Sequence, residues 1–256
     1  MKRIIFLFAL LQILACQKDT DSLPVLFDQL DEYISTNADF PLVRDSLIAC
    51  AAGGQDGLFS SEVSPVSIFF YPEGEATEFQ YFETSSENVD PDDLSNYQRK
   101  SLDQEAVFNG YLRRFLRAAP AETIWCRVTF VKSGRLHISN AIRVKIGDLP
   151  TEYNPNLLTI DQTDPLSPVF TWDDGRTADN AIYFHVVLDS DGDLLSGTYT
   201  FERQFRFYDL SNVVLNIRDV SPVPQLQANQ GYTFVLMGVS ADNWVNLLLD
   251  QSFDTN

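Results

Sequence analysis

The chain has 256 residues, of which 45% are hydrophobic and 12% aromatic, so it is long and apolar enough for one or two folded domains and is not disordered as a whole. Its 19 Phe and 10 Tyr residues, with only 2 Met, favour β structure. The formal net charge of −18 repels phosphate groups, so nucleic acid is excluded as an expected partner.

Residues 1–15 (MKRIIFLFALLQILA) have the composition of a signal peptide. Lys2 and Arg3 form a basic start, and residues 4–14 are apolar apart from Gln12. This apolar run is too short to span a bilayer as a stable helix, which needs roughly 20 residues. We therefore expect residues 1–15 to be removed, which makes the net charge −20.

The segment that follows resembles the processing and export signals of bacterial lipoproteins. Residues 13–16 (Ile-Leu-Ala-Cys) resemble a lipobox, although Leu14 is bulkier than is usual at its position. Directly after Cys16, the short polar run resembles the export signal of surface lipoproteins of the Bacteroidota, carried by Gln17, Lys18, Asp19 and Asp21. The resemblance implies palmitate-type acyl chains on Cys16 and a lipid-anchored position on the outer membrane, facing the cell exterior. The alternatives are an ordinary signal peptide and a plain polar tether.

Residues 24–36 predict a short amphipathic helix within a lipidated tether that covers residues 16–42. Leu26, Leu30, Tyr33 and Ile34 fall on one face at helical spacing. Pro24 suits the first turn of such a helix. The helix is expected to pack on the first domain or to space it from the membrane.

Residues 43–147 alternate with a period of two and predict a first β-sandwich. Residues 66–71 and 77–83 flank a turn and predict a hairpin. The acidic residues 84–106 predict a long loop, and strands are expected again at residues 123–131 and 136–146.

Two cysteines remain if Cys16 carries lipid. Cys126 alternates with Ile124, Val128 and Phe130 and is expected to face inward, whereas Cys50 lies in a run of small apolar residues. In an oxidising compartment they form either a disulfide or two buried free thiols, and both alternatives remain open.

Residues 148–156 are rich in turn-forming residues and predict a linker, and residues 157–256 predict a second sandwich with six or seven short strands. This half resembles fibronectin type III-like and immunoglobulin-like domains through residues 168–172, 182–188 and 231–235. The resemblance implies that Trp172, Tyr183 and Tyr232 fill the core. The predicted fold class is therefore mainly β, with two tandem immunoglobulin-like or fibronectin III-like antiparallel sandwiches.

Residues 189–193 (Asp-Ser-Asp-Gly-Asp) are the sharpest polar cluster. Asp189, Asp191 and Asp193 have a spacing that offers oxygens to calcium, the one cofactor considered. Asp-Gly between two β runs is also a hairpin-turn signal, and a turn is the preferred interpretation of residues 189–193.

The sequence contains no local pattern typical of a catalytic site, and neither His137 nor His185 belongs to a metal-binding motif. Trp125 and Trp244 are candidate platforms for sugar stacking, with packing as the alternative. The preferred hypothesis is a non-catalytic surface lipoprotein that binds or displays through its sandwiches, with a membrane anchor and an unidentified protein or glycan ligand. The alternatives are a glycan-binding accessory lipoprotein of an outer-membrane uptake system and a carbohydrate-active enzyme.

Overall fold

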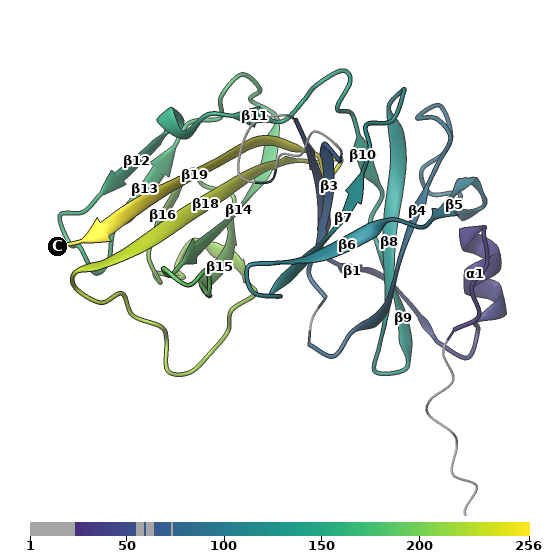
Figure 1. Cartoon of the computed structure of the whole chain (residues 1–256), viewed down its shortest axis with the longest axis horizontal. Coiled ribbons are helices and arrows are strands. Elements are labelled where there is room, and N and C mark those ends of the chain that lie inside the picture. Colours follow the sequence, from purple (N-terminus) through teal and green to yellow (C-terminus); the bar gives the residue numbers. More distant parts are fainter. Residues whose placement is uncertain (1–23, 55–58, 60–63, 73) are drawn as a thin grey trace, which may run out of the picture.

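A computed structural model describes residues 24–54, 59, 64–72 and 74–256, arranged as two β-sandwiches side by side (Figure 1). The predicted signal peptide, Cys16 and the export-signal residues Gln17, Lys18, Asp19 and Asp21 lie outside the described residues. Among the described helices, none is both long enough and apolar enough to cross a membrane. The prediction of a mainly β chain with two tandem sandwiches is confirmed.

The first sandwich consists of two sheets whose facing side chains form one core. One sheet has the order β1 (Leu42–Leu47), β9 (Arg135–Ser139), β8 (Ile124–Lys132), β4 (Thr77–Glu83) and β5 (Gln98–Lys100), with β10 (Ile142–Val144) also on β8. The other has the order β2 (Ala49–Gly53), β3 (Val66–Phe70), β7 (Leu112–Arg117) and β6 (Asp103–Val107). The chain passes from one sheet to the other at Ile48, between β1 and β2.

Two local predictions for this half were wrong. The strands at residues 66–71 and 77–83 do not form a hairpin, because β3 and β4 lie in opposite sheets and the turn between them crosses the sandwich. The predicted loop at residues 84–106 contains a 3-10 helix (η1, Leu94–Asn96), β5 and the start of β6. The short polar strands at its end alternate too weakly for a periodicity argument to detect them.

Helix α1 (Leu30–Thr36) covers the outer face of the first sheet. Leu30 and Tyr33 are fully buried there against Phe82, Tyr97 and Ile138. The helix begins six residues later than predicted, and Leu26 is 46% exposed. The preceding segment is extended because the Asn37 side chain bonds both main-chain groups of Val25, at 2.7 Å each.

The second sandwich has one sheet of six strands and one of three. The larger has the order β11 (Glu152–Tyr153), β19 (Val245–Thr255), β18 (Gln230–Ser240), β14 (Asn180–Leu188), β15 (Leu194–Thr200) and β17 (Val213–Asn216). The smaller has the order β12 (Leu158–Asp161), β13 (Val169–Trp172) and β16 (Gln204–Arg206), and a 3-10 helix (η2, Pro155–Leu157) precedes β12. Part of the expected linker thus enters the larger sheet as β11.

The expected core aromatics of the second sandwich lie where the resemblance placed them. Trp172, Tyr183 and Tyr232 are buried in one cluster between the two sheets. The Tyr232 hydroxyl accepts a hydrogen bond of 2.8 Å from the main-chain N–H of Gln227, five residues upstream. A tyrosine with this bond at the corner before its strand is characteristic of immunoglobulin-like sandwiches.

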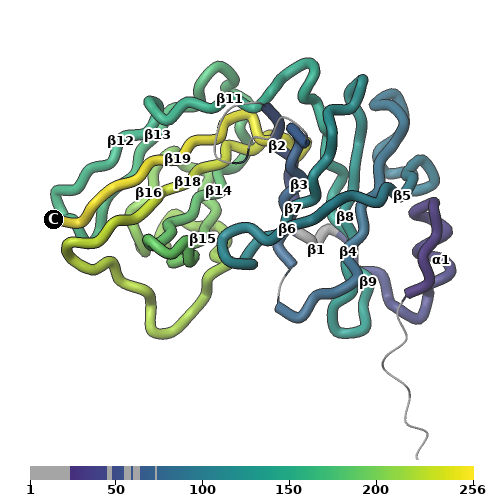
Figure 2. Tube along the Cα trace, viewed as in Figure 1, coloured from purple at the N-terminus to yellow at the C-terminus, as the bar shows by residue number. Residues whose placement is uncertain are grey.

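The two sandwiches are stacked face to face, so that four sheets lie in one series (Figures 1 and 2). A third apolar cluster fills the space between them, with Phe69 and Leu112 from the first sandwich and Phe184, Val235 and Met237 from the second. Strand β14 is therefore buried on both faces. Helix α1 and the C-terminus lie at opposite ends of the stack.

Candidate functional site

The turn between β18 and β19 belongs by sequence to the second sandwich and reaches into the first. Trp244, at this turn, is fully buried in the core of the first sandwich. Its indole N–H donates a hydrogen bond of 2.9 Å to the main-chain oxygen of Leu149. The main-chain oxygen of Asn243 accepts from the N–H of Ala51 at 3.0 Å, so the turn also lies against β2 of the first sandwich.

Polar contacts hold the same junction at its surface. The Asp242 carboxylate accepts hydrogen bonds from Lys145 Nζ at 2.9 and 3.1 Å. Asn243 has a φ of 61°, a left-handed conformation that asparagine tolerates better than most residues, and it donates from its side chain to the main-chain oxygen of Ala141. The turn is thus fixed by its backbone, by an ion pair and by a buried indole.

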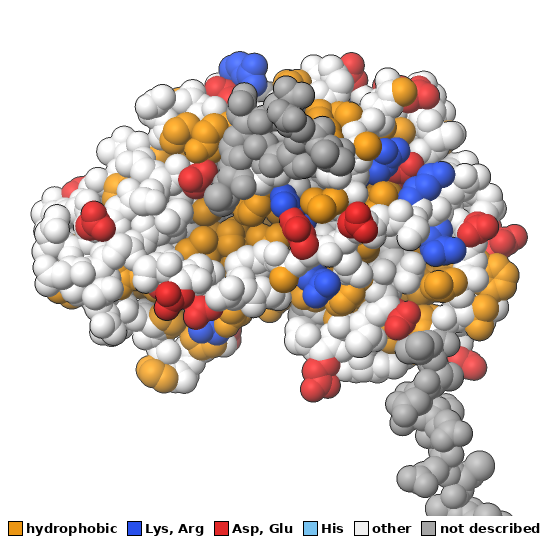
Figure 3. Space-filling model, viewed as in Figure 1, with side chains coloured by type: hydrophobic (Ala, Val, Ile, Leu, Met, Phe, Trp, Pro, Cys, Tyr) orange, Lys and Arg blue, Asp and Glu red, His pale blue; other side chains and the backbone are white. Residues whose placement is uncertain are grey.

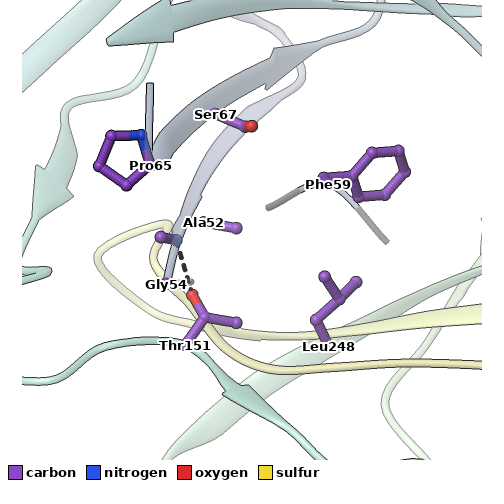
Figure 4. A pocket seen from close by; sticks show the side chains of 8 residues that line it. Ala52, Gly54, Phe59, Pro65, Ser67, Thr151 and Leu248 are labelled. Carbon is purple, nitrogen blue, oxygen red and sulfur yellow. Dashed lines mark hydrogen bonds between the residues drawn. The ribbon is translucent and has the colours of Figure 1, made fainter. Parts of the chain in front are cut away.

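A second crossing involves Thr151, between the two sandwiches. Its hydroxyl accepts from the N–H of Gly53 at 2.8 Å and donates to the main-chain oxygen of Val245 at 2.8 Å. Beside it lies a small cavity lined mainly by apolar side chains, among them Ala52, Phe59 and Leu248 (Figure 4). The space-filling view shows apolar side chains gathered in the hollow between the two halves (Figure 3).

The principal candidate site is a groove between the sandwiches, with a volume of about 240 Å³. The first sandwich contributes the strand switch around Ile48 and Cys50, and the second contributes one face of its larger sheet. The lining side chains of the second sandwich are Ile182, Phe184, Tyr199, Leu215 and Val239, and Asn140 and Asn243 supply amide groups. We call this space the junction groove.

The junction groove is electrostatically neutral and mostly apolar. Burial raises the pKa of the Cys50 thiol to about 12 and also raises the pKa of the Tyr199 phenol, so both groups stay uncharged at neutral pH. The rings of Phe184 and Tyr199 stack at 4.6 Å between centroids and form a flat apolar wall. These properties suit an apolar side chain or a similar ligand better than an ion.

The two cysteines are free thiols, and the structure separates them. Cys126 faces the core of the first sandwich, as predicted, whereas Cys50 packs against the cluster between the sandwiches. Neighbouring residues of a strand point to opposite faces, and Ala49 and Ala51 occupy the inward positions of β2. The disulfide alternative is therefore not realised in this fold.

Neither tryptophan proposed for sugar stacking offers a free face. Trp244 is in the core, so its proposed role in glycan contact was wrong. Trp125 is partly buried, donates from its indole to the main-chain oxygen of Glu87 at 3.1 Å, and has the Arg143 guanidinium 5.8 Å from its ring centroid.

Residues 189–193 form a turn between β14 and β15. The Asp189 carboxylate accepts hydrogen bonds from the N–H groups of Asp191 and Asp193 at 3.0 and 2.9 Å, and Gly192 has a φ of 82°. Within the part of the chain that the structure describes, no three or more His, Cys, Asp or Glu side chains are grouped to hold a metal ion. The three aspartates are arranged along a hydrogen-bonded turn.

The histidines have packing positions. His137 stacks on Phe130, with 5.0 Å between ring centroids. His185 is fully buried in the second sandwich, where its Nδ1 lies 2.9 Å from the hydroxyl oxygen of Thr198, and burial lowers its pKa to about 3. A histidine that stays neutral in this way is a poor general acid at physiological pH.

Sequence reasoning missed the junction groove. Its residues come from both sandwiches, and Ile48, Tyr199 and Leu215 carry no motif. The available signal was the run at residues 181–188, which is apolar at successive positions and thus typical of a strand covered on both faces.

No protein-family model matches the chain, and the search of curated proteins gives no match. Among solved structures, a crystal structure of the FN1–FN3 domains of chicken CNTN1 is similar over 85% of this chain and 68% of that chain, with 12% sequence identity and a TM-score of 0.27. This similarity is too low to support an inference about the chain, and the two sandwiches are defined by the strand order alone.

Proposed function

We propose that this protein is a non-catalytic binding protein, held on the outer surface of the outer membrane by lipid on Cys16, which presents the junction groove to a partner. The resemblance of residues 13–21 to lipoprotein signals supports the anchor. The position of α1 and the C-terminus at opposite ends of the stack supports an arrangement in which the second sandwich stands away from the membrane (Figure 1).

The observation that carries the binding role is the construction of the junction groove. Both sandwiches contribute to its wall, and they are fixed to each other by Trp244, the Asp242–Lys145 ion pair and the apolar cluster between them. A groove between rigid parts loses little conformational entropy when it is filled, which favours binding. Its lining of apolar and amide side chains is that of a recognition site.

The anchor is tested by feeding radiolabelled palmitate to cells that make the full chain. We expect label on the wild-type protein and none on the Cys16→Ala variant. Protease added to intact cells should degrade the wild-type protein if it faces outward. Wild-type protein without label, or labelled protein that only broken cells expose, would contradict the anchor or its orientation, respectively.

The binding role is tested by photo-crosslinking on the same cells. A photoreactive amino acid at Asn140, an exposed residue at the groove, should give a defined crosslinked product. The same group at exposed Thr159, in β12 of the distal sheet, is the matched control. Equal crosslinking from both positions would show that the groove is not the binding surface.

The glycan-binding alternative has lost its main support, because Trp244 lies in a core. The indole N–H of Trp125 bonds to the main-chain oxygen of Glu87, and the Arg143 guanidinium lies over its ring. The proposed binding surface is therefore the junction groove and not an aromatic side chain that stacks on a sugar.

A further inference from the structure

Strand β17 (Val213–Asn216) forms one edge of the six-stranded sheet. It pairs with β15 on one side, and within the described residues no strand lies on its other side. The main-chain N–H of Ile217 bonds inward to the oxygen of Gly197 at 2.8 Å. Because inward and outward bonding alternate along an antiparallel strand, Asn216 directs its main-chain N–H and C=O to the open side.

This edge is only four residues long and its pairing with β15 shifts register between Tyr199 and Thr200, but neither charge nor proline blocks it. Val214 is 48% exposed and Leu215 is 42% exposed, and the strand has no charged residue and no proline. Two other edges are charged, since β5 reads Gln-Arg-Lys and β6 begins Asp-Gln-Glu, and the uncharged edge β2 is covered by hydrogen bonds to Asn243 and Thr151. Natural proteins place such charges on edge strands to block pairing with another chain, so an uncharged, apolar edge is an exception that needs an explanation.

The open edge continues directly into the junction groove. Phe184, Tyr199 and Leu215 are register partners in successive strands and form one row across the sheet, and all three line the groove. Residues in one row point to the same face. A strand added beside β17 would therefore place one side chain next to Leu215, on the face where the groove lies.

The charges around β17 indicate the kind of chain that fits. Glu202 and Asp209 lie near its beginning and Asp219 near its end, and none of the three makes a salt bridge with a described residue. The nearby Arg218 has its guanidinium over the Tyr111 ring, 4.8 Å from the centroid. The edge is thus apolar in the middle and has two carboxylates near its beginning, whereas Arg218 and Asp219 offset each other at its end.

We propose that β17 is the docking edge for an extended segment of another polypeptide, which adds to the sheet as a strand. The segment carries an apolar side chain that enters the junction groove beside Leu215, with Lys or Arg at the end that lies near Glu202 and Asp209. This deepens the proposed binding function and rests on it, by naming the class of partner. A second copy paired in parallel fits less well, because the carboxylates near the beginnings of the two β17 strands would lie together.

The first test uses a short synthetic peptide of alternating aliphatic and lysine residues and the full chain with Cys16→Ala. Two N-methylated forms of the peptide lack amide hydrogens at one or the other set of alternate residues. Only one set can bond to β17, so one form should bind about tenfold more weakly while the other keeps its affinity. Binding that is unchanged for both forms would overturn the proposal.

Protein variants provide the second test. Leu215→Lys should weaken peptide binding about tenfold or more, because the charge repels the peptide and occupies the edge. Leu166→Lys adds the same charge at an exposed apolar residue between β12 and β13, in the other sheet of the second sandwich, and should bind the peptide nearly as the wild type does. Equal affinity of the wild type and Leu215→Lys would overturn the proposal, and so would a wild-type dimer that this variant dissociates in sedimentation experiments.

The experiments distinguish a failure of strand addition at β17 from a failure of the proposed binding function. Palmitate labelling and crosslinking from Asn140 do not depend on strand addition. A labelled protein that crosslinks at the groove but binds peptides independently of their amide hydrogens would keep the general binding role and overturn the docking edge.

Discussion

The indole nitrogen of Trp244 lies 2.9 Å from the main-chain oxygen of Leu149, and the ring completes the core of a sandwich to which its own strand does not belong. The residue immediately after it, Val245, begins the last strand of the second sandwich. One side chain therefore belongs to the packing of the first sandwich and is held by the backbone of the second.

Trp244→Ala should destabilise the protein by about 3 to 5 kcal/mol, the usual cost of removing a buried tryptophan. The loss should appear as one shifted transition in urea unfolding, because the sandwiches share the cluster between them. Trp125→Ala, at a partly exposed site, is the control and should cost less. Two separate transitions in the wild-type protein would show that the sandwiches unfold independently.

Reduction should leave stability unchanged, because Cys50 and Cys126 are free thiols in different clusters. Burial raises the pKa of both thiols, so a thiol-directed reagent should react slowly with folded protein carrying Cys16→Ala and rapidly after unfolding. The measurement is unfolding with and without reductant. A loss of about 4 kcal/mol on reduction would instead indicate the disulfide.

His185 should make the protein less stable in mild acid. Burial lowers its pKa from 6.5 to about 3, so the unfolded chain takes up the proton first as the pH falls. Its contribution is therefore constant above pH 6.5 and is lost between about pH 6.5 and pH 3. Between pH 7 and pH 5, wild-type protein should lose about 2 kcal/mol more of its free energy of unfolding than His185→Phe. Equal losses in the two proteins would refute this assignment.

Asp189→Ala should cost about 1 to 2 kcal/mol, because two main-chain N–H groups lose their acceptor. Asp191→Ala should cost almost nothing, since the Asp191 side chain is exposed. Thermal unfolding with calcium and with a chelator is the measurement, and the same cost is expected in both. A calcium-dependent rise in the melting temperature of wild type that Asp189→Ala abolishes would restore the metal site.

The sequence predicted the architecture well where one face of a strand is polar. Alternation correctly placed Cys126 toward the core of the first sandwich, and the resemblance correctly placed Trp172, Tyr183 and Tyr232 in the core of the second. The strand expected at residues 123–131 is present as β8, and the one expected at residues 136–146 is divided into β9 and β10.

The failures occur where a strand is covered on both sides. His185 alternates with Phe184 and Val186 along β14, yet all three are buried, His185 against the core of the second sandwich and the other two in the cluster between the sandwiches. Cys50 lies in a run of small apolar residues without alternating polar positions, so the sequence could not predict which face of the strand its side chain occupies. The junction groove was missed for the same reason. Where two sandwiches stack face to face, the strands between them are covered on both sides, and their sequences lose the alternation of polar and apolar residues.

The position of Trp244 also has a consequence for the order of events during synthesis. A ribosome delivers the chain from its N-terminus, so the strands of the first sandwich emerge about a hundred residues before the side chain that fills their core. Until then that sandwich has a gap the size of an indole and exposes the apolar face around Phe69. We therefore expect a nascent chain of this protein to depend on a chaperone that holds it until synthesis ends. Truncation before the last turn should destabilise the first sandwich, even though the deleted residues are far from it in the sequence.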